Sequence, residues 1–92
     1  MIVGVQVLTY AELPAVKAKV LGALNAGETL LDFSGLQHAD SSALSLLLAA
    51  KRRADACGAA LAFRGLPPSI QELAKLYGVD AFLGDVEYAS RS

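Results

Sequence analysis

Short apolar runs alternate along this chain with longer segments in which apolar residues recur at helical spacing. The runs at 2–8 ("IVGVQVL"), 29–33 ("TLLDF") and 59–63 ("AALAF") have the length and composition of buried strands. A helical pattern follows each of them. Strands that alternate with helices predict an α/β domain, with a small, mainly parallel sheet covered by about three crossover helices.

The first predicted helix follows the run at 2–8. Thr9 and Glu12 have the spacing of a capping box. Pro14 favours a start nearer Glu12, because proline deeper in a helix removes a hydrogen bond. The helix is expected to end at 25–27, "NAG", whose residues tolerate the left-handed conformation.

The two later helices have equally clear signals at their ends. We expect Asp40 to cap the second helix, which runs to about Cys57 and stops at Gly58. Pro68 suits the first position of the third helix, and Gly78 stops it. The apolar positions of both helices predict one core, which contains Leu44, Leu47, Ile70 and Leu73.

The C-terminal part of the chain carries weaker signals. The segment 79–83 is expected to form a last short strand. The polar segment 84–92 is expected to fray. The prediction is therefore one domain over residues 1–83, followed by a tail.

Composition excludes several classes of function. The chain has 92 residues and a net charge of -1, without a basic block, so general nucleic-acid binding is not expected. The strongest apolar run, 44–50, is too short to span a membrane, and the N-terminus lacks the pattern of a signal peptide. Cys57 is the single cysteine and cannot form an internal disulfide. We expect a soluble cytoplasmic domain.

The residues needed for common catalytic chemistry are missing from the sequence. Neither "GxxxxGK[ST]" nor "GxGxxG" occurs, so no phosphate-binding loop is predicted. His38 is the only histidine, and we expect it to face solvent or to be satisfied in a loop. Cys57 is expected to be a small core residue. One histidine and one cysteine are too few for a zinc site. We therefore predict no catalytic residues, no metal and no cofactor.

The second helix has two distinct sides. At 100° per residue, one side is apolar and is expected to face the core, through Ala43, Leu44, Leu47, Ala50 and Ala54. The opposite stripe consists of small residues that end in a basic pair, namely Ser41, Ser45, Ala49, Arg52 and Ala56, flanked by Ser42 and Arg53. The simplest interpretation of this stripe is a solvated face. The functional interpretation is a flat surface on which another protein docks.

The serines at the start of this helix exceed what capping needs. One capping residue suffices, and Asp40 already provides it. The hydroxyls of Ser41 and Ser42 are then free, at the positive end of the helix dipole, where a phosphate is well tolerated.

Residues 30–50, "LLDFSGLQHADSSALSLLLAA", resemble the central motif of STAS domains, which are anti-sigma-factor antagonists and their relatives. In that family, a buried strand ending in Asp leads through a short loop to an Asp-Ser-Ser/Thr-Gly-Leu helix start. The positions that match are Asp32, Asp40, Ser41, Ser42 and Leu44. Ala43 stands where the family has glycine. STAS domains commonly carry a further N-terminal strand, and this chain begins at what resembles the second.

The segment 70–83, "IQELAKLYGVDAFL", is similar to the last helix of the small STAS subunit of the Mla phospholipid-transport ABC system. That branch carries "LAKLY", found here at 73–77. The resemblance implies a subunit that binds the cytoplasmic ATPase of the transporter, and through it the membrane permease, at the inner face of a bacterial inner membrane. It implies no direct membrane insertion.

Three hypotheses about function follow. The first is this non-enzymatic subunit, with Asp40, Ser41, Ser42, Ser45 and Arg52 in the partner-binding face. The second is an anti-sigma-factor antagonist, in which the resemblance implies phosphorylation of Ser41 by a partner kinase. The third is a STAS module that binds a nucleotide or a lipid. Only the first is favoured by "LAKLY".

Overall fold

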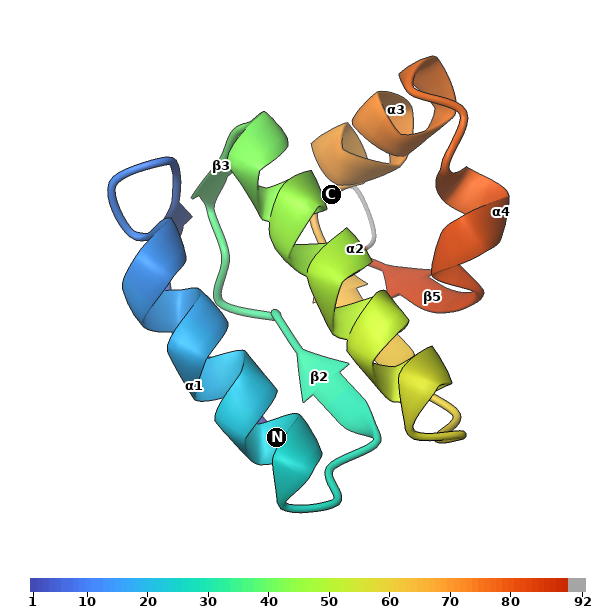
Figure 1. Ribbon diagram of the computed structural model, residues 1–92. Helices are drawn as coiled ribbons and strands as arrows, with labels where there is room; N and C mark the ends of the chain where they lie inside the picture. The colour runs from blue at the N-terminus through green and yellow to red at the C-terminus, as the bar shows by residue number, and fades with distance from the viewer. Residues whose placement is uncertain (90–92) are drawn as a thin grey trace.

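The computed structural model describes residues 1–89, which form a mixed α/β domain with parallel strands and four helices (Figure 1). In chain order, the elements are β1 (Val7–Leu8), α1 (Leu13–Asn25), β2 (Leu30–Asp32), β3 (His38–Ala39), α2 (Ser41–Ala56), β4 (Ala62–Leu66), α3 (Pro68–Leu76), α4 (Asp80–Leu83) and β5 (Asp85–Tyr88).

All strand pairs in the described residues are parallel, as the alternation of strands and helices predicts. One sheet has the order β2-β4-β5, and β1 pairs with β3 in a second, two-stranded sheet. In the three-stranded sheet, α2 connects β2 to β4, and α3 and α4 connect β4 to β5. Parallel neighbours need such crossovers, because a tight turn can join only antiparallel strands.

The predicted strand at 2–8 is interrupted, which corrects the expectation of one continuous run. Ile2 forms an isolated bridge with Asp32, and the Val3 amide donates to the Asp32 carbonyl at 2.8 Å. Gly4 then has a φ of 69°, a left-handed conformation that ends the extended backbone. Pairing resumes only at β1. The chain alongside it is broken in the same way, since the segment 34–37 separates β2 from β3.

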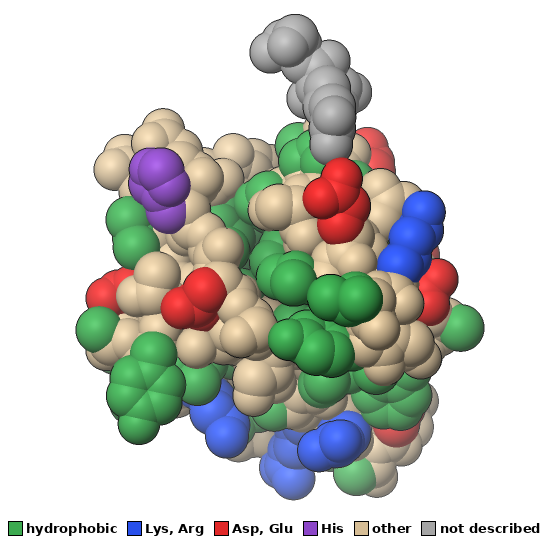
Figure 2. Space-filling model, turned by 90° about the horizontal axis from the view of Figure 1, so that it is seen from above, with side chains coloured by type: hydrophobic (Ala, Val, Ile, Leu, Met, Phe, Trp, Pro, Cys, Tyr) green, Lys and Arg blue, Asp and Glu red, His purple; other side chains and the backbone are tan. Residues whose placement is uncertain are grey.

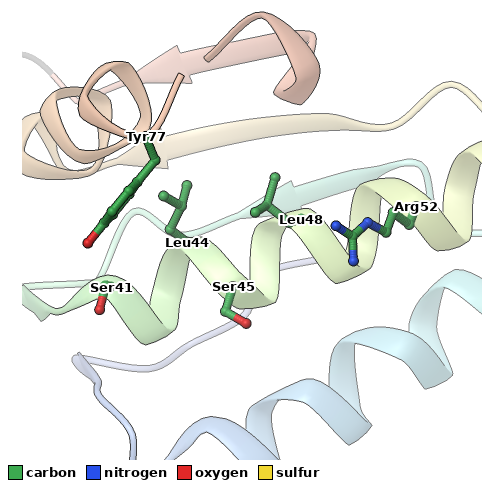
Figure 3. Close-up of a pocket in the computed structure, with 6 residues that line it drawn as sticks. All are labelled: Ser41, Leu44, Ser45, Leu48, Arg52 and Tyr77. Carbon is green, nitrogen blue, oxygen red and sulfur yellow. The ribbon is translucent and has the colours of Figure 1, made fainter. Parts of the chain in front are cut away.

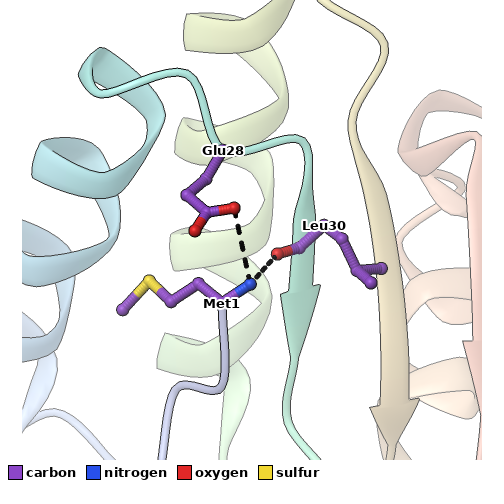
Figure 4. A network of polar contacts seen from close by, with 3 residues as sticks. All are labelled: Met1, Glu28 and Leu30. Atoms are coloured by element: carbon purple, nitrogen blue, oxygen red, sulfur yellow. Dashed lines mark hydrogen bonds and ion pairs between the residues drawn. The ribbon is translucent and has the colours of Figure 1, made fainter.

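The amino group of Met1 is bound at the other end of this segment (Figure 4). It donates to the Leu30 carbonyl at 2.7 Å and lies 3.7 Å from a carboxylate oxygen of Glu28. These contacts, together with the bridge at Ile2, hold residues 1–3 against β2.

The third strand, β4, lies three residues later than predicted, because a bulge allows Arg64 and Gly65 to belong to it. The register of β4 against β5 shifts between Arg64 and Leu66. Gly65 has a φ of 70°, and an added Cβ there would lie 2.8 Å from the backbone N and Cα of Ser34. The sequence "RGLPPS" was expected to be a turn, but only the prolines after Leu66 leave the sheet.

The C-terminal part differs most from expectation. The segment 79–83, expected as a strand, contains the short helix α4, and the expected frayed tail contains β5, paired with β4. The domain therefore extends beyond Leu83, at least to Tyr88. Residues 90–92 of the predicted tail lie outside the described residues.

The helices begin and end close to where their signals predict. The Glu12 carboxylate accepts from the Thr9 amide at 3.0 Å, so half of the capping box forms, but α1 begins at Leu13. The helices α1, α2 and α3 share one C-terminal pattern, in which the second residue after the cap donates its amide back into the last turn. None of the helices in residues 1–89 has the length and apolar character needed to cross a membrane.

The core lies beneath α2, which packs against α1 on one side and α3 on the other (Figure 1). The predicted core side of α2 is buried throughout: Ala43, Leu44, Leu47, Ala50 and Ala54. Ile70 is buried and Leu73 is half-buried against the same cluster, as expected. Leu46 is also buried, although the periodicity did not place it in the core. Neighbouring helices on both sides explain why the buried arc of α2 is wider than predicted.

Cys57 is exposed, which corrects its assignment to the core. It is the C-cap of α2, one residue after the last helical position, and the chain turns away at Gly58. Ala54 is the last buried residue of the helix.

The close approach of Ser34 to Gly65 generates a prediction about stability. Gly65→Ala should lower the free energy of unfolding, because the new methyl group meets the backbone of Ser34 as well as its hydroxyl, and the backbone cannot rotate away. Gly58→Ala is the matched control, since Gly58 also has a φ of 70° but has open space around its Cβ position. Both variants incur about 1–2 kcal/mol of left-handed strain. We expect Gly65→Ala to cost a further 1–3 kcal/mol, roughly, in urea unfolding, as overpacked sites do. Equal losses for the two variants would contradict the steric argument.

Candidate functional site

The start of α2 is fixed by Asp40, as the sequence predicts. Its Oδ1 accepts a hydrogen bond from the Ser42 amide at 2.8 Å, and its backbone is extended. The Ser41 side chain takes no part in this cap and is exposed. Ser42 is half-buried, so its hydroxyl is less accessible than expected. Asp40 therefore caps the helix, and the exposed side chain of Ser41 is not used by the cap.

A pocket of about 340 Å³ lies along the outer side of α2 (Figure 3). Six residues line it: Ser41, Leu44, Ser45, Leu48, Arg52 and Tyr77. Three of the five predicted partner-binding residues, Ser41, Ser45 and Arg52, therefore line one hollow. Asp40 and Ser42 do not line it. We call this hollow the α2–α3 pocket, because Tyr77 closes it from the end of α3.

Tyr77 follows Ile70, Leu73 and Ala74 at helical spacing, but its side chain is 58% exposed. It is the C-cap of α3, and Gly78 follows with a φ of 70°. The Val79 amide donates to the Ala74 carbonyl at 2.9 Å, which completes the helix end. In Figure 3, the Tyr77 ring projects from this end toward the first turns of α2. The motif "LAKLY" contains this residue, but no local pattern indicates that Tyr77 shares a pocket with Ser41.

The three consecutive cations of α2 have different roles. Lys51 Nζ lies 3.3 Å from a carboxylate oxygen of Asp55, in the next turn. Arg53 donates to Asn25 Oδ1 on α1 from two nitrogens, at 2.7 and 3.1 Å. Arg52 lines the pocket and forms no ion pair with any residue among 1–89. The two residues of the predicted basic pair therefore differ: Arg53 links α2 to α1, and Arg52 has no ion pair within residues 1–89.

Apolar side chains gather at the surface around the end of the molecule where α2 begins. Figure 2 looks down on this end and shows green side chains grouped near the centre, with blue Lys and Arg side chains along the lower edge. Tyr77 of the pocket and its neighbour in sequence, Leu76, are both exposed, Leu76 to 76%. Exposed apolar groups next to a pocket are typical of interaction sites.

Groups for catalysis are not assembled at the pocket. His38 is exposed on β3 and does not line it. Within residues 1–89, no cluster of three or more His, Cys, Asp or Glu side chains could hold a metal ion. The pocket lining offers apolar surface, the hydroxyls of Ser41, Ser45 and Tyr77, and one guanidinium, which suits binding.

The loop that leads to α2 begins with a hydrogen-bonded carboxylate. Both the hydroxyl and the amide of Ser34 donate to Asp32 Oδ1, the amide at 2.8 Å. The hydroxyl first, and then the amide, hold the pKa of Asp32 below its ordinary value of 3.8. This contact fixes the end of β2 where Ser34 lies against Gly65. Elsewhere, burial and the charge of Asp80 raise the pKa of Tyr88.

The arrangement of these elements is that of STAS domains. A solved structure titled "The Structure of an Anti-sigma-factor antagonist (STAS) domain protein from Planctomyces limnophilus" superposes on this chain with a TM-score of 0.73. The two are 19% identical, and the alignment covers 97% of this chain and 78% of that one. This likeness shows the fold.

Residues 5–85 match the family described as "Mlab, STAS domain", and the chain belongs to that family. The resemblance found in the central motif is thereby confirmed. No curated protein matches the sequence.

The hydrogen bonds to Asp32 generate a prediction about pH. Ser34→Ala removes the strongest of them, so the pKa of Asp32 should rise toward 3.8, as followed by NMR of the carboxyl carbon. A depressed native pKa stabilises the fold above the unfolded pKa, and this contribution is lost as pH falls through the native pKa. Wild type should therefore be more stable than Ser34→Ala near neutral pH, with a smaller difference in acid. Ser69→Ala, which removes an exposed hydroxyl from α3, is the control. A difference that does not vary with pH would rule out the carboxylate as its source.

Proposed function

We propose that this chain is a non-enzymatic STAS subunit that binds the cytoplasmic ATPase of a bacterial phospholipid-transport ABC transporter and supports its assembly and activity. In this proposal the chain works at the inner face of the inner membrane, and its contact with the membrane permease is indirect. The partner-binding face comprises Asp40, Ser41, Ser42, Ser45 and Arg52, and Tyr77 extends it.

The observation that carries the proposal is the meeting of two motifs in one pocket. Ser41 and Ser45 come from the serine-rich helix start typical of STAS domains, and Tyr77 is the last residue of "LAKLY". Ser45 and Tyr77 are 32 residues apart in the sequence. A shared surface gives both motifs one role, which is recognition of a partner.

The character of the pocket supports binding rather than turnover. Its lining contains no histidine, cysteine or carboxylate that could act as a general base or as a nucleophile activated by one. Its serines carry short side chains on a helix, so the backbone of another protein can approach closely. The family assignment, with its description "Mlab", supports the transport system as the context.

A second candidate is an anti-sigma-factor antagonist, switched by phosphorylation of Ser41. The exposed hydroxyl of Ser41 in the first turn of α2 favours it, because a phosphate there would lie near the positive end of the helix dipole. The same residue is thus a docking contact in the first proposal and a substrate in the second.

Affinity purification from a native lysate separates the two candidates. We expect the tagged chain to recover an ABC ATPase, and with it the permease, in a specific complex. The matched variant is Ser45→Arg, which fills the pocket without changing the buried side of α2 and should therefore not recover the ATPase. A serine kinase and a sigma-factor regulator recovered in place of the ATPase would favour the second candidate.

Ser41 is the position at which docking and folding can be measured separately. Ser41→Ala should change the free energy of unfolding by no more than about 0.5 kcal/mol, as for ordinary surface positions. Ser41→Glu should weaken ATPase binding more than tenfold, because an unpaired carboxylate in a packed interface costs about 2 kcal/mol or more. Isothermal titration calorimetry and thermal unfolding measure the two effects.

The control for Ser41→Glu is Ser69→Glu, which introduces the same charge in the first turn of α3, outside the pocket. Full ATPase affinity in Ser41→Glu would eliminate the docking role of Ser41. Loss of folding in Ser41→Ala would make the serine a structural residue.

A further inference from the structure

We propose that the α2–α3 pocket binds an amphipathic helix of the partner protein, with one apolar side chain against Leu48 and Tyr77 and one carboxylate, a helical turn away, on Arg52. This inference rests on the proposed function for its setting and adds the chemistry of the segment that is recognised.

The apolar end of the pocket is suited to a single large side chain. Leu44 forms its floor and is only 3% exposed, whereas Leu48 is half-buried and Tyr77 is mostly exposed. The surfaces of Leu48 and Tyr77 therefore remain to be covered. A partner side chain placed between them removes apolar area from water on two sides, which is the usual environment of an interface anchor.

The polar end of the pocket is defined by charge. Lys51 and Arg53 already have partners within the domain, but Arg52 has no ion pair with the described residues. A guanidinium at the rim of an apolar pocket selects for a carboxylate, because the fork of N–H donors can bind both oxygens. The lining contains no acidic side chain that could neutralise Arg52 from within.

The secondary structure around the pocket favours a helix as the occupant. The pocket is lined by residues of α2 and by the capped end of α3, so no strand edge with free amides and carbonyls is present there. An extended segment would leave its own backbone groups unpaired at this site. A helix satisfies these groups internally and uses only its side chains.

The spacing on α2 sets the spacing expected in the partner. Leu48 and Arg52 are four residues apart on one helix, which is about 6 Å along its axis. On a partner helix packed along α2, side chains three or four positions apart match that separation. Ser41 and Ser45 extend the pocket by two further turns of small side chains, where the partner helix can approach closely.

The test uses the full chain as bait for a displayed library of random peptides of about 16 residues, enough for four turns of helix. The selected peptides should carry Asp or Glu three or four positions from Leu, Ile, Met or Phe, and should gain helical circular dichroism on binding. Their affinity should fall at least about tenfold for Arg52→Glu and for Tyr77→Ala, as for central interface residues.

Two variants serve as controls. Lys17→Gln removes an exposed cation from α1, and Tyr10→Ala removes an exposed aromatic ring; neither residue lines the pocket. Both should retain the affinity of wild type. The same variants are then titrated with the purified transporter ATPase, and we expect the same order of affinities.

The outcomes separate this inference from the proposed function. If wild type selects the predicted pattern but does not bind the ATPase, the pocket chemistry is supported and the proposed partner is wrong. If wild type binds the ATPase and Arg52→Glu and Tyr77→Ala bind it equally well, the inference is overturned. A library that yields no binders, or binders without the apolar–acidic pattern, also overturns it.

Discussion

The position of α2 determines most of what this domain can do. The helix buries a wide arc of apolar side chains against its neighbours, including α1 and α3, and Leu46 joins the predicted core residues in that arc. On the other side of the helix, an open strip that includes Ser41, Ser45, Arg52 and Ala56 is exposed to solvent. Because the phase of the helix is fixed by its buried leucines, the open strip is fixed too. The fold thus presents a defined row of small and basic side chains without any dedicated binding loop.

The helix phase also explains why adjacent arginines have different functions. Successive residues on a helix are rotated by about 100°, so Arg52 and Arg53 cannot face the same neighbour. Arg53 points to α1, where Asn25 holds it with two hydrogen bonds. Arg52 points to the α2–α3 pocket and stays available. From the sequence, the two residues were treated as one basic pair, because the neighbours toward which their side chains point are not known from the sequence alone.

The helices could be predicted well from the sequence and the strands less well, for physical reasons. Capping residues and glycines mark helix ends locally, as at Asp40 and Gly58. The limits of a short strand depend on its neighbours: β4 continues through Gly65 because Ser34 of the adjacent chain segment fits closely against it. The strand β5 alternates polar and apolar residues over only four positions, too few for a clear pattern. Tyr77 was missed at the pocket because the approach of α3 to α2 is a tertiary contact that no local signal contains.

The residues that line the pocket can be substituted without loss of the fold, because the fold depends mainly on other side chains. Asp40 caps α2 and the leucines form the core, whereas the side chains of Ser41, Ser45 and Arg52 form no hydrogen bond or ion pair within residues 1–89. Substitution at these three positions alters shape and charge at the surface alone. Leu44 is the exception, since it is both the floor of the pocket and part of the core. Substitutions at Ser41, Ser45 and Arg52 can therefore change which partner is bound. Leu44, the floor of the pocket, cannot change as freely, because the core needs it.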